Sequence, residues 1–261
     1  MSQTTIAKAA MAETGKLKVH SATLDDFPGW DRSGAFIKEL ILSNGSKRIG
    51  DVGGGRMPRV DLDFIKKNDI DYYLFDISAS ELALADAAYH KIEMDVCCDD
   101  QDFSKIGAPR DLDLIFSHML LEHLPDPMAA HRNFLKMLKP GGMSVHMFPS
   151  KNNFPLLLNS MIPESASRTI LRLVQPHRNE IGEEGKFEAF YHYCGVPRDS
   201  TLKAYEAIGF EVVGQTRYVG HEYYRRIPPL AALERKLRPL IAKLGLPFIS
   251  AHLLVLRKPA L

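Results

Sequence analysis

The sequence predicts an α/β fold built on a doubly wound, mostly parallel sheet, and three observations support this. Short apolar runs alternate with amphipathic segments between residues 48 and 148. The first of these runs end in glycine or aspartate, and the same alternation resumes after residue 200. Strands and helices in alternation form parallel βαβ units with right-handed crossovers, and such units assemble into a sheet with helices on both faces.

The expected elements follow in chain order. Strands are expected at residues 48–53, 71–78, 90–96, 111–117 and 142–148, with helices at 59–67, 79–88 and 126–138 between them. The helix at 126–138 has the clearest helical spacing of apolar residues, and "KPGG" at 139–142 ends it. A helix at 200–209, a strand at 210–220, a helix at 228–245 and a strand at 251–259 complete the chain.

Three segments lie outside this alternation within what we interpret as one domain over residues 1–261. Residues 1–30 look like a frayed N-terminal arm, because they contain no long apolar core. Residues 149–199 hold five prolines and no clear strand, and the length and aromatic content of residues 150–198 fit an inserted lid that excludes water. The alternative is an insertion that only supports a dimer. Residues 222–248 form a helical insertion before the last strand.

The bulk composition narrows the class of protein. The net charge is +1, with 33 Lys and Arg against 32 Asp and Glu, so no nucleic-acid partner is expected. Three cysteines with no zinc-type spacing predict no metal and fit a reducing compartment. No apolar run reaches the roughly 18 residues of a membrane helix. We expect a cytoplasmic protein, either a monomer or a homodimer.

The ends of the first three strands carry the candidate chemistry. "GDVGGGRMP" at 50–58 places Asp51 before a glycine-rich turn, where the backbone can approach a ligand closely. Asp76 ends the second strand, about 20 residues further on, where a carboxylate accepts hydrogen bonds from ribose hydroxyls. Asp95 and Val96 end the third strand, and we expect them to meet an adenine amino group and one base face.

The glycine turn departs from the dinucleotide-binding pattern. G-x-G-x-x-G requires a third glycine for close packing of the helix, and this chain has Pro58 there. Proline is favoured at the start of a helix, and a ligand without a pyrophosphate needs no third glycine. A dehydrogenase therefore remains the weaker interpretation.

In these motifs the chain resembles class I S-adenosylmethionine-dependent methyltransferases. "DVGGGRM", Asp76, Asp95-Val96, "LEHLPDP" at 121–127 and "LKPGG" at 138–142 match that family in register, and the segment around "LEHLPDP" is similar to its ubiquinone-biosynthesis-like members. The resemblance implies a Rossmann-like sheet of seven strands in the order 3-2-1-4-5-7-6, with the last strand antiparallel. It also implies S-adenosyl-L-methionine as cofactor, held by Asp51, Gly53, Gly54, Gly55, Asp76, Ile77, Asp95, Val96, Ser117, His118 and His123. In related enzymes the segment after the fifth strand covers the acceptor site, and we expect residues 150–198 to do so here.

Two histidines are candidates for a catalytic base. His118 follows the fourth strand at the sheet edge that faces the site, and the competing interpretation is that it only lines the pocket. His192 lies in the aromatic segment "FEAFYHYCGVP" at 187–197, between Tyr191 and Tyr193, and we assign these three residues to acceptor binding. The competing interpretation is that they are packing residues. A histidine serves an alcohol, phenol or amine acceptor, whereas a carboxylate acceptor needs no base.

The function predicted from the sequence is methyl transfer to a small-molecule acceptor by in-line displacement, with O-methylation as the first guess. A tRNA or protein methyltransferase and a regulatory protein that binds the cofactor without catalysis are the alternatives. The helix at 230–245 carries basic residues opposite its leucines. We favour a core-facing helix with a solvated basic face. The alternative is a contact with a membrane surface or a lipid substrate.

Overall fold

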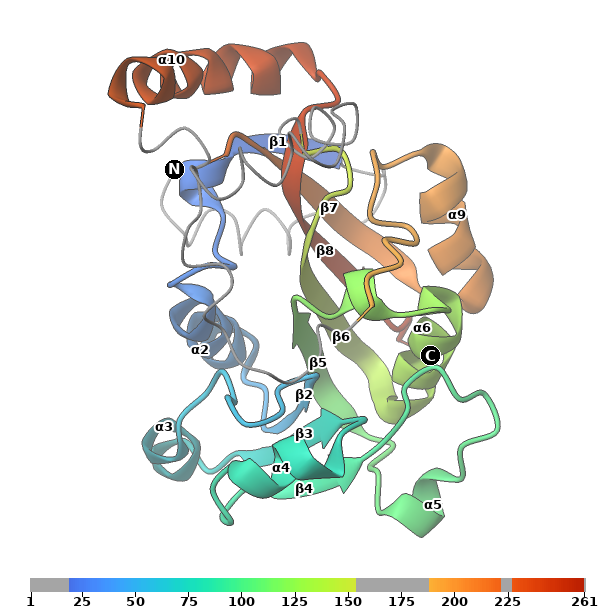
Figure 1. Cartoon of the computed structure of the whole chain (residues 1–261). Helices are drawn as coiled ribbons and strands as arrows, with labels where there is room; N and C mark the ends of the chain where they lie inside the picture. The colour runs from blue at the N-terminus through green and yellow to red at the C-terminus, as the bar shows by residue number, and fades with distance from the viewer. Residues whose placement is uncertain (1–18, 154–187, 222–226, 261) are drawn as a thin grey trace.

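The computed structural model describes residues 19–153, 188–221 and 227–260. These residues form one sheet with the strand order β1-β7-β8-β6-β5-β2-β3-β4 (Figure 1). The strands are β1 Val19–Thr23, β2 Arg48–Val52, β3 Asp71–Asp76, β4 His90–Glu93, β5 Leu112–His118, β6 Leu138–Pro149, β7 Glu211–Val219 and β8 Ile249–Arg257.

The sheet confirms the predicted strand order. Strands β2 to β8, counted from one to seven, lie in the order 3-2-1-4-5-7-6. The last of them, β8, pairs antiparallel with both β6 and β7, and the other pairs are parallel. The parallel strands therefore end at one common edge, where a doubly wound sheet places its ligand.

An eighth strand was not expected. Residues 19–23, which we assigned to a frayed arm, form β1 and pair in parallel with β7, from Val19 opposite Gln215 to Thr23 opposite Val219. Further along the same segment, Phe27 is buried against Tyr218, with ring centroids 4.9 Å apart. The free backbone groups at the outer edge of β7 give β1 its hydrogen bonds, and burial of Phe27 holds the chain beside them.

Helices cover both faces of the sheet. The α-helices are α2 Ser33–Asn44, α3 Leu62–Lys67, α4 Ala79–Leu84, α5 Phe103–Ile106, α6 Pro127–Met137, α9 Asp199–Ile208 and α10 Pro228–Leu244. Helices α2 and α3 share one buried cluster with the sheet, and α5, α6 and α9 share the cluster on the other face. Asp61, Ser78 and Asp126 cap α3, α4 and α6, which fixes where these helices begin.

Helices α2 and α5 were not predicted. In α2 the apolar residues Phe36, Ile37, Leu40 and Ile41 are buried, but the helix precedes residue 48, where the predicted alternation begins. Helix α5 has only four residues, too few for a periodic signal. Most of the expected 150–198 insertion lies outside the described residues.

The preferred interpretation of the 230–245 helix was wrong. Its leucines do not face the core: the fully buried residue of α10 is Arg238, and the leucines of this helix are exposed. The reason is that α10 lies above β1 and β7, away from both faces of the sheet, and is held there by ion pairs of Arg238 (Figure 1). Within the described ranges, no helix is long and apolar enough to cross a membrane.

Candidate functional site

The glycine turn after β2 has a backbone that only glycine adopts easily. Gly53 and Gly55 have φ angles of 75° and 46°, in the left-handed region. The Gly53 amide donates to the carbonyl of Phe75 at 2.8 Å, which ties the turn to β3. A Cβ at Gly54 would lie 2.5 Å from Leu74 Cδ1, so no side chain fits there. The turn therefore presents bare backbone at the carboxyl edge of the sheet.

Asp76, at the end of β3, lies against this turn. Its Oδ1 accepts a hydrogen bond from the Ser78 amide at 2.9 Å, and a Cβ placed on Gly55 would lie 3.2 Å from its Oδ2. Partial burial raises the pKa of the Asp76 carboxyl above its usual value. The carboxylate is thus fixed in direction by the backbone, with its second oxygen at the glycine turn.

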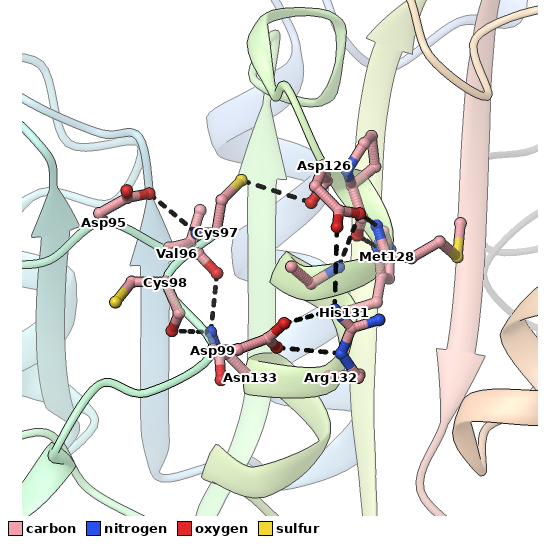
Figure 2. A network of polar contacts seen from close by, with 12 residues as sticks. Asp95, Val96, Cys97, Cys98, Asp99, Asp126, Met128, His131, Arg132 and Asn133 are labelled. Atoms are coloured by element: carbon pink, nitrogen blue, oxygen red, sulfur yellow. Dashed lines mark hydrogen bonds and ion pairs between the residues drawn. The ribbon is translucent and has the colours of Figure 1, made fainter.

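The loop after β4 places Asp95 and Val96, and helix α6 holds this loop. Asp95 Oδ1 accepts from the Cys97 amide at 2.9 Å. Asn133 of α6 is buried and donates through Nδ2 to the carbonyls of Val96, at 2.9 Å, and Cys98, at 2.8 Å (Figure 2). One buried amide therefore fixes the backbone on both sides of Cys97.

Two further contacts in Figure 2 join the same loop to α6. Arg132 binds Asp99 with both a Nε and a Nη2 hydrogen bond, at 3.0 and 2.6 Å. Cys97 Sγ donates to the carbonyl of Asp126, whose carboxylate caps α6. Asn133 and Arg132 were not predicted, because the periodicity of a helix marks its apolar face and not the partners of its polar residues. One signal was available in the sequence: the helix expected at 126–138 carries polar residues that can bind the loop with Asp95 and Val96.

A cavity of about 360 Å³ opens between these elements. It is lined by Val52, Gly53, Asp76, Ile77, Met94, Asp95, Val96, Cys97, Met119, Leu120, His123, Leu124 and Pro125. Six predicted cofactor residues are thus brought together, namely Gly53, Asp76, Ile77, Asp95, Val96 and His123. The apolar wall from Met94, Met119, Leu120 and Leu124 was not predicted. The cavity has the volume of a small-molecule site, and a few polar groups lie among its apolar lining residues.

Asp51 lies behind the glycine turn and is not among the residues that line this cavity. It is buried, and its Oδ2 accepts from the hydroxyl of Tyr72 at 2.6 Å and from the Arg59 amide at 3.1 Å. Burial raises the pKa of Asp51 to about 6, against the lowering effect of the Tyr72 hydrogen bond. Through these two hydrogen bonds the Asp51 carboxylate stabilises the glycine turn from behind.

Ser117 also lies outside the cavity lining. Its hydroxyl is fully buried and bonds His146 Nδ1 at 2.8 Å, across the β5–β6 pair where the two residues are register partners. The hydroxyl of Ser144 satisfies the other ring nitrogen of His146 at 2.7 Å. Burial lowers the pKa of His146 well below its usual value, so this histidine is a neutral core residue.

His118, the last residue of β5, points to the opposite face of the sheet from Ser117. Its Nε2 bonds the carbonyl of Gly29, and because a carbonyl only accepts, Nε2 carries the proton. Nδ1 is then left with its lone pair, and it has no hydrogen-bond partner within residues 19–153, 188–221 and 227–260. Burial lowers the pKa of His118, which keeps the ring neutral at neutral pH, and His118 is not among the residues that line the cavity.

The turn Leu121–His123, labelled η2, connects the cavity to the segment that contains Tyr191. His123 lines the cavity and bonds the carbonyl of Glu188 through Nδ1 at 2.9 Å. The carbonyl of Glu122 accepts from the amides of Phe190 and Tyr191 at 2.8 and 3.0 Å. Glu122 is 4% exposed, and burial raises the pKa of its carboxyl to about 7.

The three predicted acceptor residues do not line the cavity. His192 is exposed and stacks on Phe190, with ring centroids 5.9 Å apart. Tyr193 lines a separate, polar cavity of about 240 Å³ together with Lys151 and Arg198. Tyr191 and Tyr193 have φ angles of 54° and 60°, a conformation rare for bulky residues and often found at functional sites.

Comparisons with known proteins agree with the fold. A family model described as a methyltransferase domain matches residues 30–215. The [4+2]-cyclase SpnF aligns with a TM-score of 0.51 at 16% identity, over 98% of this chain and 92% of that chain. Phosphoethanolamine N-methyltransferase 2 of Haemonchus contortus, in complex with S-adenosyl-L-methionine, aligns with a TM-score of 0.50 at 15% identity, over 85% of this chain and 52% of that chain.

A third solved structure, an S-adenosylmethionine-dependent methyltransferase from Mesorhizobium loti, has a TM-score of 0.50 at 16% identity and covers 85% of this chain and 98% of that chain. At such identities the likeness shows the fold alone, and one of these proteins is a cyclase. No curated protein matches the chain.

Proposed function

Since this chain belongs to the methyltransferase domain family, we propose that it transfers the methyl group of S-adenosyl-L-methionine to a small-molecule acceptor, with an oxygen atom as the first candidate. One observation carries the proposal. The glycine turn, Asp76 and Asp95 come from three strands and meet at one cavity at the carboxyl edge of the sheet.

The residues present fit this cofactor. Asp76 is positioned to accept hydrogen bonds from two ribose hydroxyls, because its neighbours fix the direction of the carboxylate. Asp95 offers an acceptor for the adenine amino group. The apolar side chains of Ile77, Val96 and Leu124 supply surfaces for the adenine faces. The open backbone at Gly53 leaves room for the amino-acid part.

When bound, this cofactor supplies a methyl group on a sulfonium, which needs no further activation as a leaving group. The task of the protein is to align the acceptor for in-line attack and to keep water away. Alignment of this kind contributes about 7–11 kcal/mol in well-oriented systems. For an alcohol or phenol acceptor, the chain must also remove one proton.

We assign that proton to Nδ1 of His118, whose other nitrogen is held by the Gly29 carbonyl. Replacement of His118 by alanine is expected to lower kcat by about 10²-fold or more with an oxygen acceptor, because a positioned base contributes roughly 10²–10⁴-fold. The His192→Ala change, at an exposed ring, is the matched comparison. Release of S-adenosylhomocysteine measures both rates. Equal rates for His118→Ala and the unchanged protein would exclude the base.

Isothermal titration with S-adenosyl-L-methionine tests the cofactor directly. We expect one site with a dissociation constant of roughly 1 μM to 1 mM, the range of enzymes for their substrates. NAD, the ligand of the dehydrogenase alternative, should give no heat. A failure of S-adenosyl-L-methionine to bind the ligand-free protein would overturn the proposal. Binding without methyl transfer to any acceptor would instead favour a regulatory protein.

The acceptor is to be found by a screen of small alcohols, phenols, amines and carboxylates for release of S-adenosylhomocysteine, with tRNA and protein substrates as the contrasting classes. The near-neutral charge of the chain supports a small molecule over tRNA. Cys97, Cys98 and Cys194 are free thiols, which supports our assignment to the reducing cytoplasm.

A further inference from the structure

Helix α10 presents an apolar stripe to the outside of the molecule. Its five leucines lie on one side of the helix and are Leu230, Leu233, Leu237, Leu240 and Leu244, with exposed fractions of 37%, 54%, 42%, 51% and 62%. Scattered exposed leucines are ordinary on a protein surface, but a continuous stripe of them over a 17-residue helix is not.

The helix is held in this orientation by a polar anchor. The buried guanidinium of Arg238 binds Asp25 at 2.8 Å and Glu234 at 2.8 Å, and donates to the carbonyl of His221 at 2.8 Å. Glu234 in turn accepts from the His221 amide at 3.1 Å. The side of α10 that contacts Asp25 and His221 is therefore polar, whereas its leucine side stays exposed. This arrangement is the reverse of a helix that buries its leucines in the core.

The apolar surface continues from the helix onto the body of the protein. A groove of about 340 Å³ runs between the leucine stripe and the ends of β7 and β8. Its apolar lining includes Val219, Leu230, Leu237, Ile241 and Phe248. A flat partner that contacts the stripe would therefore also cover the mouth of this groove.

The exposed charges of α10 all have one sign. Arg235, Lys236 and Lys243 are exposed, and the single acidic residue of the helix, Glu234, binds Arg238. A second copy of this chain docking by the same surface would bring these cations together with their own copies. A surface of anionic lipid headgroups would instead complement them.

We propose that α10 binds the surface of an anionic lipid bilayer, with its leucines in the boundary between headgroups and acyl chains and its lysines against the phosphates. This is the behaviour of amphipathic helices that combine an apolar stripe with Lys and Arg. The inference does not depend on methyl transfer, and it does not require the helix to span the bilayer.

Flotation of the full chain with vesicles tests it. The protein should float with vesicles of mixed phosphatidylglycerol and phosphatidylcholine, and at least tenfold less with phosphatidylcholine alone. The variant Leu233→Ser/Leu237→Ser/Leu240→Ser should lose binding at least tenfold. Leu42→Ser/Leu84→Ser is the matched control, because these leucines are 57% and 62% exposed on α2 and α4. Lys236→Glu/Lys243→Glu should remove the preference for anionic vesicles.

Circular dichroism and light scattering complete the experiment. Each variant should keep the helix content of the unchanged chain, which shows that a loss of binding is not a loss of fold. No flotation of the unchanged chain, or equal flotation of the leucine variant and its control, would overturn the proposal. A dimer that the leucine variant loses, without vesicle binding, would also overturn it, by making the stripe an interface between copies.

Discussion

Replacement of Asp76 by alanine is expected to weaken S-adenosyl-L-methionine binding by about 100-fold. Two hydrogen bonds from ribose hydroxyls to an ionised carboxylate contribute about 1.5 kcal/mol each, and about 1.4 kcal/mol corresponds to tenfold in affinity. Asp76→Asn, which keeps an acceptor but loses the charge, should show a smaller loss. Because burial raises the pKa of Asp76, affinity should also fall in mildly acidic buffer as this carboxylate takes up a proton.

The control for this change is Glu93→Ala. Glu93 is the register partner of Asp76 on β4, is exposed, and is not among the residues that line the cavity. The Glu93→Ala change removes one negative charge from the same region of the sheet as Asp76→Ala does. Titration calorimetry measures both affinities, and circular dichroism checks the fold. An Asp76→Ala protein that folds and binds the cofactor as tightly as the Glu93→Ala protein would mean that the ribose lies elsewhere.

Replacement of Glu122 by glutamine is expected to stabilise the protein at alkaline pH. The Glu122 carboxyl is buried, its Oε2 has no hydrogen-bond partner in the described part of the chain, and burial raises its pKa from 4.5 to about 7. Between these two values the unfolded chain ionises while the folded chain keeps the proton, so folding loses stability as pH rises. Above about pH 7 the folded state holds a buried charge.

Glutamine is neutral throughout, so the variant escapes this loss. The free energy of unfolding of Glu122→Gln, relative to the unchanged chain, should be about 3 kcal/mol higher at about pH 8.5 than at about pH 5. Urea unfolding at the two pH values measures it, with Glu93→Gln as an exposed control. The same stability difference at both pH values would show that Glu122 ionises normally in the folded protein.

The parts of the site that the sequence predicted are those set by local chemistry. Asp76 and Asp95 each follow a short apolar run directly, and parallel strands bring their ends to one edge. Gly53 was predictable because only glycine suits a turn that approaches a ligand. The order of seven strands, which the family resemblance implied, was also confirmed.

The parts that were missed depend on partners distant in the chain. Strand β1 exists because β7, almost 200 residues later, offers it an edge. Ser117 lies near the end of a strand as expected, but the alternation of side chains directs it to His146 on the neighbouring strand. In α10 the periodicity gave the leucine stripe correctly, but not which side faces the protein. That was decided by Asp25, which pairs with Arg238.

The short strand β1 also has a consequence for how this protein behaves in solution. Without it, the nine-residue β7 would be the outermost strand, and the amides and carbonyls along its outer edge would be available to another chain. Such long open edges are templates for aggregation. With it, the outermost strand has only five residues, and α10 packs beside it. Strand β1 therefore protects the edge of the sheet against association with another chain.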